Sequence, residues 1–127
     1  MTAANMADLT EPTIDAQTPT NDSVSVPIGV APTLTFSEAM DAATLNGGTI
    51  QLRAYTGDTP VAASILYNSS TFVVTITPNA NLSYSTQYYL YVSGAKDVAG
   101  NTESTDYTAG TKANHEFTTA ADSADHT

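Results

Sequence analysis

The sequence predicts an all-β sandwich of about seven short antiparallel strands, and three observations lead to this fold class. Apolar residues alternate with polar ones through most of the chain, which is the two-residue period of half-buried strands. Clusters of Asn, Gly, Ser, Asp and Pro separate these runs, as turns do. Charged residues are only 13% of the 127 residues, and Thr, Ser and Asn take their place, which favours strands over helices.

The alternating runs define the expected strands in order. A first strand is expected at residues 13–18, with a short extension at residues 24–26. The next strands are defined by their inward-facing sets: Leu34 and Phe36; Ile50, Leu52 and Ala54; Val61, Ala63, Ile65 and Tyr67; Phe72, Val74 and Ile76; Tyr88, Leu90 and Val92. Phe117 marks a last strand at residues 114–119. A single helical turn fits residues 41–45.

The segment from Leu82 to Tyr88 predicts a structural tyrosine. A leucine, a short polar link and a tyrosine that opens a strand resemble the tyrosine corner of sandwich domains. We therefore expect the Tyr88 ring to pack inside, with its hydroxyl group bonded to backbone a few residues upstream.

The charge balance excludes several classes of partner. Three Lys and Arg against 13 Asp and Glu give a formal net charge of −10, which repels phosphate backbones and anionic lipids, so we expect neither nucleic acid binding nor membrane insertion. The sequence has no cysteine and no apolar run of about 18 residues. Acidity suits either the attraction of divalent cations or simple solubility.

Three regions are expected along the chain. Residues 1–11 are a polar N-terminal linker, residues 12–119 form the sandwich, and residues 120–127 are a C-terminal tail. The first residues lack the basic and apolar regions of a signal peptide, so we interpret the chain as one domain of a longer protein.

Five motifs, in order, resemble one known family. They are P-T-L-T-F-S-E-A-M-D at residues 32–41, V-T-I-T-P at 74–78, Leu82 with Tyr88, G-A-K-D-V-A-G-N at 94–101 and F-T-T at 117–119. Together they are similar to the bacterial immunoglobulin-like (Ig-like) domains of the SbsA type, first described in surface-layer proteins. The resemblance covers roughly residues 12–119. It implies an Ig-like sandwich, tandem repetition and export to the cell surface or beyond, and it does not imply catalysis. The stretch 102–112 is longer than the family's last hairpin needs.

Two loops form a candidate calcium site. If the strands alternate in direction, the loop with Glu38 and Asp41 and the loop with Asp97 and Asn101 fall at the same end of the sandwich. Oxygen ligands from both loops, completed by a preceding module, suit Ca²⁺. The alternative is structural: Asp97 and Asn101 cap a turn in which Gly100 takes a positive φ, and Glu38 and Asp41 cap the following helical turn.

Tyrosines define a candidate binding surface. Tyr89, Tyr91 and Tyr107 alternate onto the face opposite the core or lie in a loop, where exposed rings stack on sugars or anchor protein partners. The alternative is that they cover the sheet as cross-strand pairs.

The sequence thus predicts a non-catalytic spacer module of a bacterial surface or secreted protein, with neighbouring Ig-like domains as partners. The alternative function is adhesion through carbohydrate or a host protein. No catalytic motif is present, so we predict no enzyme activity. We expect the domain to be a monomer in isolation.

Overall fold

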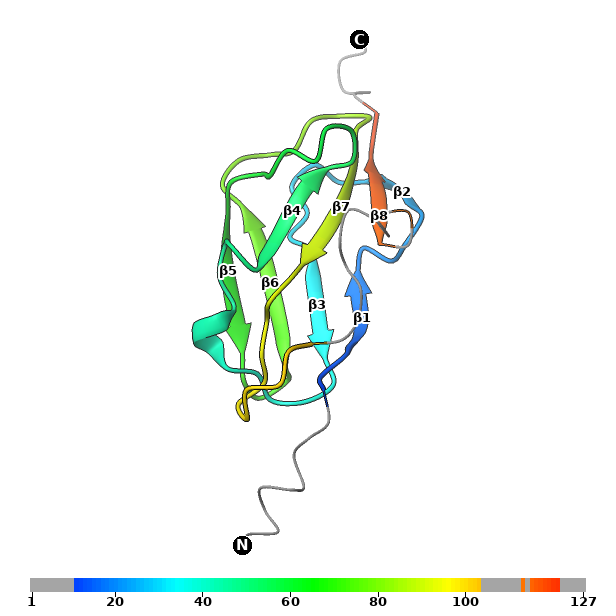
Figure 1. Cartoon of the computed structure of the whole chain (residues 1–127). Helices are drawn as coiled ribbons and strands as arrows, with labels where there is room; N and C mark the ends of the chain where they lie inside the picture. Colours follow the sequence, from blue (N-terminus) through cyan, green and yellow to red (C-terminus); the bar gives the residue numbers. More distant parts are fainter. Residues whose placement is uncertain (1–10, 104–112, 114, 122–127) are drawn as a thin grey trace, which may run out of the picture.

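The computed structural model describes residues 11–103, 113 and 115–121, and it shows two four-stranded sheets packed face to face (Figure 1). The strands are β1 (Ile14–Thr18), β2 (Ser23–Val26), β3 (Thr33–Phe36), β4 (Ile50–Ala54), β5 (Ala63–Asn68), β6 (Val73–Pro78), β7 (Gln87–Val92) and β8 (Glu116–Thr119). A helical turn, η1 (Ala42–Thr44), lies between β3 and β4. The predicted all-β sandwich is confirmed.

The two sheets have the strand orders β1-β3-β6-β5 and β2-β8-β7-β4. All pairs are antiparallel except β2 with β8, which is parallel. The sequence predicted about seven strands because it treated β2 as an extension of β1. The two segments instead belong to different sheets. Pro19 lies between them and, having no N–H, cannot continue the ladder of β1.

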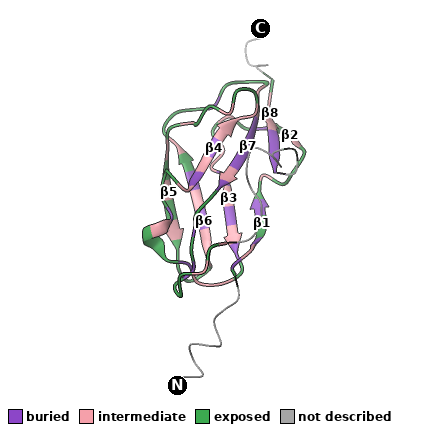
Figure 2. Ribbon diagram, in the orientation of Figure 1, coloured by how far each residue is buried: buried purple, intermediate pink, exposed green. Residues whose placement is uncertain are grey.

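The core is the layer between the two sheets, and most of its buried residues are the apolar members of the predicted alternating runs (Figure 2). Among the described residues, sixteen buried apolar residues form one cluster. Leu34, Ile50, Leu52, Val74, Ile76 and Leu90 are all 0% exposed. In β6 the expected inward residues are the buried ones, and in β7 all three are buried together with Tyr89. The strand β5, in contrast, is only half-buried on its inner side.

The tyrosine corner is present as predicted. Tyr88 is buried, and its ring stacks on Phe117 with centroids 5.9 Å apart. The backbone N–H of Ser83 donates a hydrogen bond of 3.0 Å to the Tyr88 hydroxyl group. A second tyrosine hydroxyl group also binds backbone outside its strand, because the N–H of Met40 donates to the Tyr67 hydroxyl group at 2.9 Å. These bonds tie two connections to the core, because each hydroxyl group reaches backbone outside its own strand.

Removal of a central core side chain tests this packing. Leu90→Ala should lower the free energy of unfolding by about 2–5 kcal/mol, since it removes buried methyl groups and leaves a cavity. The control Leu66→Ala, at a side chain that is 69% exposed, should change it by less than about 0.5 kcal/mol. Urea titrations followed by circular dichroism measure both. Equal effects of the two substitutions would contradict the strand orientation described here.

Candidate functional site: the acidic pole

The two loops proposed as a calcium site meet at one end of the sandwich, which we call the acidic pole and define by Glu38, Asp41, Asp97 and Asn101. Met40 and Asp97 form an isolated antiparallel bridge. Beside it the N–H of Asp41 donates to the carbonyl oxygen of Lys96 at 2.8 Å. The predicted meeting of the loops is therefore observed.

The beginning of the domain reaches the same pole. The N–H of Ser37 donates to the carbonyl oxygen of Thr13 at 2.9 Å, and the N–H of Thr13 donates to the Ser37 hydroxyl group at 2.9 Å. In Figure 1 the start of β1 and the loop after β7 lie together at the lower end of the domain. Three connections far apart in the sequence thus converge where the chain enters the sandwich.

Asp97 is the centre of the pole. Its side chain is 0% exposed. Its Oδ1 accepts hydrogen bonds from the N–H groups of Ala99, at 2.9 Å, and Asn101, at 2.8 Å, while its Oδ2 accepts from the Asn101 side-chain amide at 3.0 Å. Gly100 has φ of 93°, a conformation that suits glycine. This is the turn that the structural alternative predicted.

The electrostatics of Asp97 favour the carboxylate. Burial by itself raises the pKa of Asp97, but its hydrogen bonds with Asn101, with the Glu38 carboxyl group and with the Ala99 N–H together hold this pKa below its ordinary value. A buried carboxylate with several donors is stabilised in its charged form. Asp97 is therefore an ionised residue whose hydrogen bonds hold the loop after β7 in its conformation.

Asp41 also has a structural partner. It is the N-cap of η1, and its Oδ1 accepts a hydrogen bond of 3.0 Å from the Ala43 N–H. Among the described residues no group of three or more His, Asp and Glu side chains is placed to hold a metal ion. Calcium binding at the acidic pole stays a prediction, in which the Asp97 carboxylate already accepts hydrogen bonds from protein donors and other oxygens would have to complete the shell.

A second polar cluster covers the outer face of β4 and β7, and we call it the Arg53 cluster: Gln51, Arg53, Asp58, Tyr89 and Tyr91. The guanidinium carbon of Arg53 lies 3.6 Å from the centroid of the Tyr91 ring. Arg53 donates from Nε to Gln51 Oε1 at 2.7 Å and from Nη1 to the Tyr89 hydroxyl group at 3.2 Å. Tyr89 in turn donates to Asp58 Oδ1 at 2.9 Å.

The Arg53 cluster corrects the expected exposure of Tyr89. The Tyr89 side chain is 0% exposed, so its ring is not accessible to a ligand. It is buried because the other members of the cluster and His115 surround it, with the Tyr89 and His115 ring centroids 5.9 Å apart. Burial raises the pKa of the Tyr89 phenol, Arg53 lowers it and Asp58 raises it, with a net rise. Tyr91 is half-buried beneath Arg53. Tyr107 lies outside the described residues.

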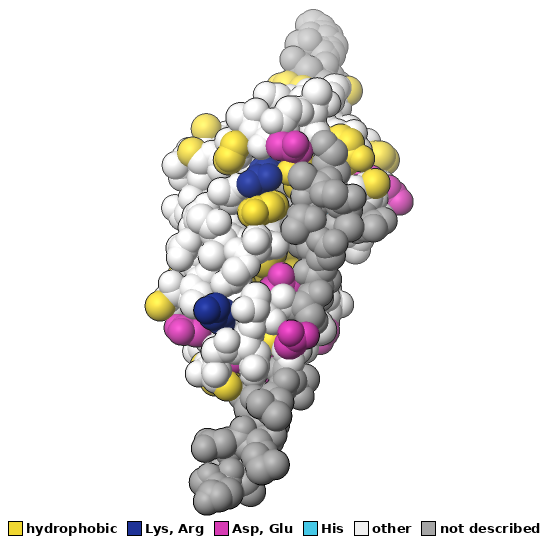
Figure 3. All heavy atoms as spheres, in the orientation of Figure 1, with side chains coloured by type: hydrophobic (Ala, Val, Ile, Leu, Met, Phe, Trp, Pro, Cys, Tyr) yellow, Lys and Arg dark blue, Asp and Glu magenta, His cyan; other side chains and the backbone are white. Residues whose placement is uncertain are grey.

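Sequence reasoning missed the Arg53 cluster because its members are far apart along the chain. The register of β4 with β7 places Gln51 opposite Tyr91 and Arg53 opposite Tyr89. The alternation of Gln51 with Arg53 and of Tyr89 with Tyr91 was a signal, but it needed this pairing to be interpreted. Figure 3 shows that charged side chains are sparse on the face in view.

Sequence reasoning also missed a buried carboxyl group. Glu116 in β8 is 7% exposed, and its Oε1 accepts a hydrogen bond of 3.0 Å from Gln87 Nε2. Burial raises the pKa of Glu116, and so does the neighbouring Asp22, through a hydrogen bond and its charge, while Gln87 lowers it. Glu116 therefore gains a proton more readily in the folded chain than in the unfolded one.

The geometry described so far defines a small Ig-like module whose polar groups mainly hold loops in place. The family comparison agrees: the sequence matches the family of bacterial Ig-like domains over residues 8–119, and the chain belongs to this family. The predicted resemblance is confirmed. A search of curated protein sequences finds no significant match.

Solved structures share the fold. The S-layer protein SbsC is 19% identical, with a TM-score of 0.62 over 93% of this chain and 15% of that chain. The methionine-rich copper resistance protein PcoC from Escherichia coli is 18% identical, with a TM-score of 0.58 over 87% of this chain and 99% of that chain. L,D-transpeptidase 1 from Mycobacterium tuberculosis is 16% identical, with a TM-score of 0.54 over 86% of this chain and 39% of that chain.

These identities show a shared fold alone. The chain spans only 15% of the length of the S-layer protein structure it matches. No helix among the described residues is long and apolar enough to cross a bilayer.

A pH titration of stability tests the environment of Glu116. Because its pKa is raised in the folded state, the folded chain binds more protons, and stability falls as the pH rises from the unfolded pKa, about 4.3, through the folded pKa. Glu116→Gln keeps an acceptor for Gln87 and stays neutral. It should therefore raise the midpoint of thermal unfolding at pH 7, with a difference from the wild type that vanishes below about pH 4.

Glu11→Gln is the matched control for this titration, because it removes one negative charge at an exposed position. Any gain that it shows at pH 7 measures the general relief of charge repulsion. If Glu116→Gln stabilises the chain no more than Glu11→Gln does, the environment described for Glu116 is wrong.

Proposed function

We propose that this chain is a non-catalytic structural module of a larger bacterial surface or exported protein, in which it sets the distance between its neighbours. Membership of the bacterial Ig-like family supports this proposal, as does the presence of the same fold within an S-layer protein. The observation that carries it most directly is the use of Asp97: the most buried carboxylate of the described chain holds a loop instead of facing a cleft.

The path of the chain suits a spacer. β1 begins at one end of the sandwich and β8 finishes at the opposite end (Figure 1). Modules joined in series through such ends lie end to end, so each adds its full length to the array. Force applied along the array runs parallel to the strands and loads the antiparallel β1–β3 and β7–β8 ladders in shear, because their hydrogen bonds are perpendicular to the strands.

The lining of a surface hollow also supports a structural role. This hollow, of about 320 Å³ in the described part of the chain, has no Asp, Glu, His, Lys or Arg in its lining. General acid–base or nucleophilic catalysis needs such groups beside a bound substrate. The carboxyl groups of Glu38 and Asp97, which lie together at the acidic pole, share a hydrogen bond with each other and do not line this hollow.

Single-molecule pulling tests the spacer role. The sequence has no cysteine, so pairs of introduced cysteines define the pulling direction without interference. Pulling from Glu11 and Ala121 should require a higher unfolding force than pulling from Ser64 and Thr77. The first pair loads ladders in shear, whereas the second pair, which are register partners in β5 and β6, opens that ladder one bond at a time. An equal or lower force for the end-to-end geometry would remove the mechanical argument.

A calcium ion at the junction between modules is the finer form of this proposal. Glu38 and Asp41 lie at the pole where a preceding module would contact this one, and oxygens from that module would complete the shell. A two-copy tandem chain should then melt at a higher temperature with about 5 mM Ca²⁺ than with a chelator. Asp41→Asn should reduce the difference, whereas Asp58→Asn, in the Arg53 cluster, should not. Identical melting curves with and without Ca²⁺ would exclude the ion.

The alternative is a binding module, and the stack of Arg53 on Tyr91 is the observation that favours it. A half-buried tyrosine beside a guanidinium group and an amide offers stacking and hydrogen bonds to a sugar. A glycan array should then give signals that Tyr91→Ala abolishes and that Tyr84→Ala, an exposed tyrosine outside the cluster, leaves unchanged. An array without signals would count against this alternative.

A further inference from the structure

The strand β5 is an edge of its sheet without the usual protection. It is the last strand in the order β1-β3-β6-β5, and in the described part of the chain it forms a ladder with β6 alone. Its register with β6 is continuous over all six residues, with no bulge. Its sequence, A-S-I-L-Y-N, has no proline and no charge. Natural edge strands normally carry a bulge, a proline or a charged side chain, because an open edge is a template for another strand.

The outer side of β5 also presents an apolar side chain. Leu66 is 69% exposed, between the exposed residues Ser64 and Asn68 on the same face. One exposed leucine is common on a protein surface. Here, however, it lies in the middle of an open edge, where a strand added beside β5 would cover it.

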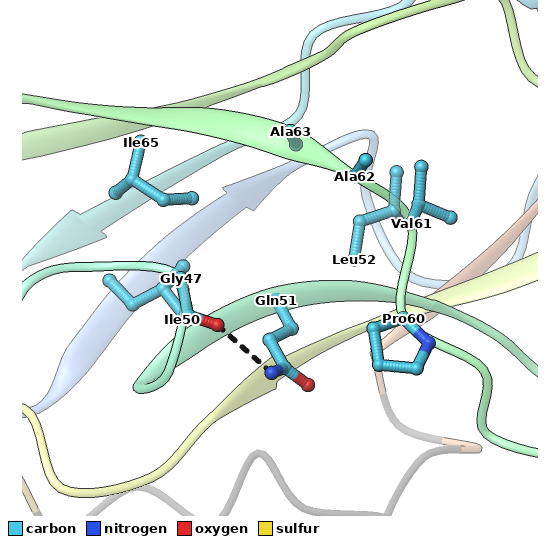
Figure 4. Close-up of a pocket in the computed structure, with 9 residues that line it drawn as sticks. All are labelled: Gly47, Ile50, Gln51, Leu52, Pro60, Val61, Ala62, Ala63 and Ile65. Carbon is cyan, nitrogen blue, oxygen red and sulfur yellow. Dashed lines mark hydrogen bonds between the residues drawn. The ribbon is translucent and has the colours of Figure 1, made fainter.

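An apolar hollow lies along the other side of β5 (Figure 4). It is the hollow of about 320 Å³ described above, and it opens between the edges of the two sheets. Ala63 and Ile65 of β5 line one side, and Ile50 and Leu52 of β4 line the other. The half-burial of Ile65 reflects this opening, so the core is incompletely covered along the same edge.

The charge pattern indicates what can approach this edge. The chain has a net charge of −10, yet residues 59–95 contain no Asp, Glu, Lys, Arg or His. This stretch includes β5, its partner β6 and the adjoining part of the hollow. A strongly charged partner finds no counter-charge there, whereas two copies of this chain can bring the same neutral strands together without placing carboxylates face to face.

We propose that the β5 edge is a self-association surface, on which a second copy of this chain adds its own β5 in antiparallel orientation about a twofold axis. Antiparallel pairing of identical strands is self-complementary, as a twofold interface requires. The two β1-β3-β6-β5 sheets then become one continuous sheet, and main-chain hydrogen bonds supply the affinity. The sequence alone led us to expect a monomer, and the open β5 edge became evident only from the order of the strands.

Sedimentation equilibrium tests the proposal. Over about 10 μM to about 1 mM, the range of weak association, the mass of the wild-type chain should rise from 13.2 kDa towards twice that value. Leu66→Glu places a carboxylate on each copy beside the twofold axis and should weaken association at least about tenfold. Amide hydrogen exchange at the two ends of the concentration range should show added protection in β5.

The matched control is Val24→Glu, because Val24 is 72% exposed and lies in β2, at the edge of the other sheet that is farthest from β5. It adds the same charge and should associate like the wild type. Circular dichroism should show that both variants stay folded. A wild-type chain that remains a monomer at 1 mM would overturn the proposal. So would equal weakening by the two variants, or protection that appears outside β5. The proposal is independent of the spacer role, which the pulling experiment tests.

Discussion

The apolar layer between the two sheets is the interaction on which the rest of this domain depends. The chain has no cysteine, so no disulfide joins the sheets, and a single cluster of sixteen buried apolar residues holds them together. Strands of four to six residues are too short to be stable alone, so each is ordered only because its inner face is buried against the opposite sheet. Burial on this scale also fixes the register, since a slip of one residue would turn every inner side chain outward.

Once the layer is formed, buried polar groups keep the connections in place. Asp97 closes the loop after β7 through three hydrogen bonds, and the Tyr88 and Tyr67 hydroxyl groups accept bonds from backbone N–H groups in two other connections. Each group satisfies donors that burial would otherwise leave without a partner. These hydrogen bonds hold connections at both ends of the sandwich in place, which suits the proposed role as a spacer between modules.

The surface divides into regions with different capacities. The acidic pole concentrates oxygen ligands where a preceding module would meet this one, and the Arg53 cluster places the only arginine of the sequence on a tyrosine ring. The β5 edge, in contrast, is neutral and has an open ladder. The proposed connection in series would use the poles and the proposed lateral contact would use the β5 edge, so one module could take part in both.

The sequence alone determined the fold class, because the two-residue alternation and the turn residues are local signals. It also indicated Tyr88 as a corner tyrosine and the meeting of the loops of Glu38 and Asp97, since both follow from strand order. Only the tertiary structure decided the rest. Tyr89 is on the outer face, as the alternation predicts, yet it is buried, because Arg53, Asp58 and His115 reach it from other elements. Burial of an outward residue depends on what crosses above it, and that information is not local to its strand.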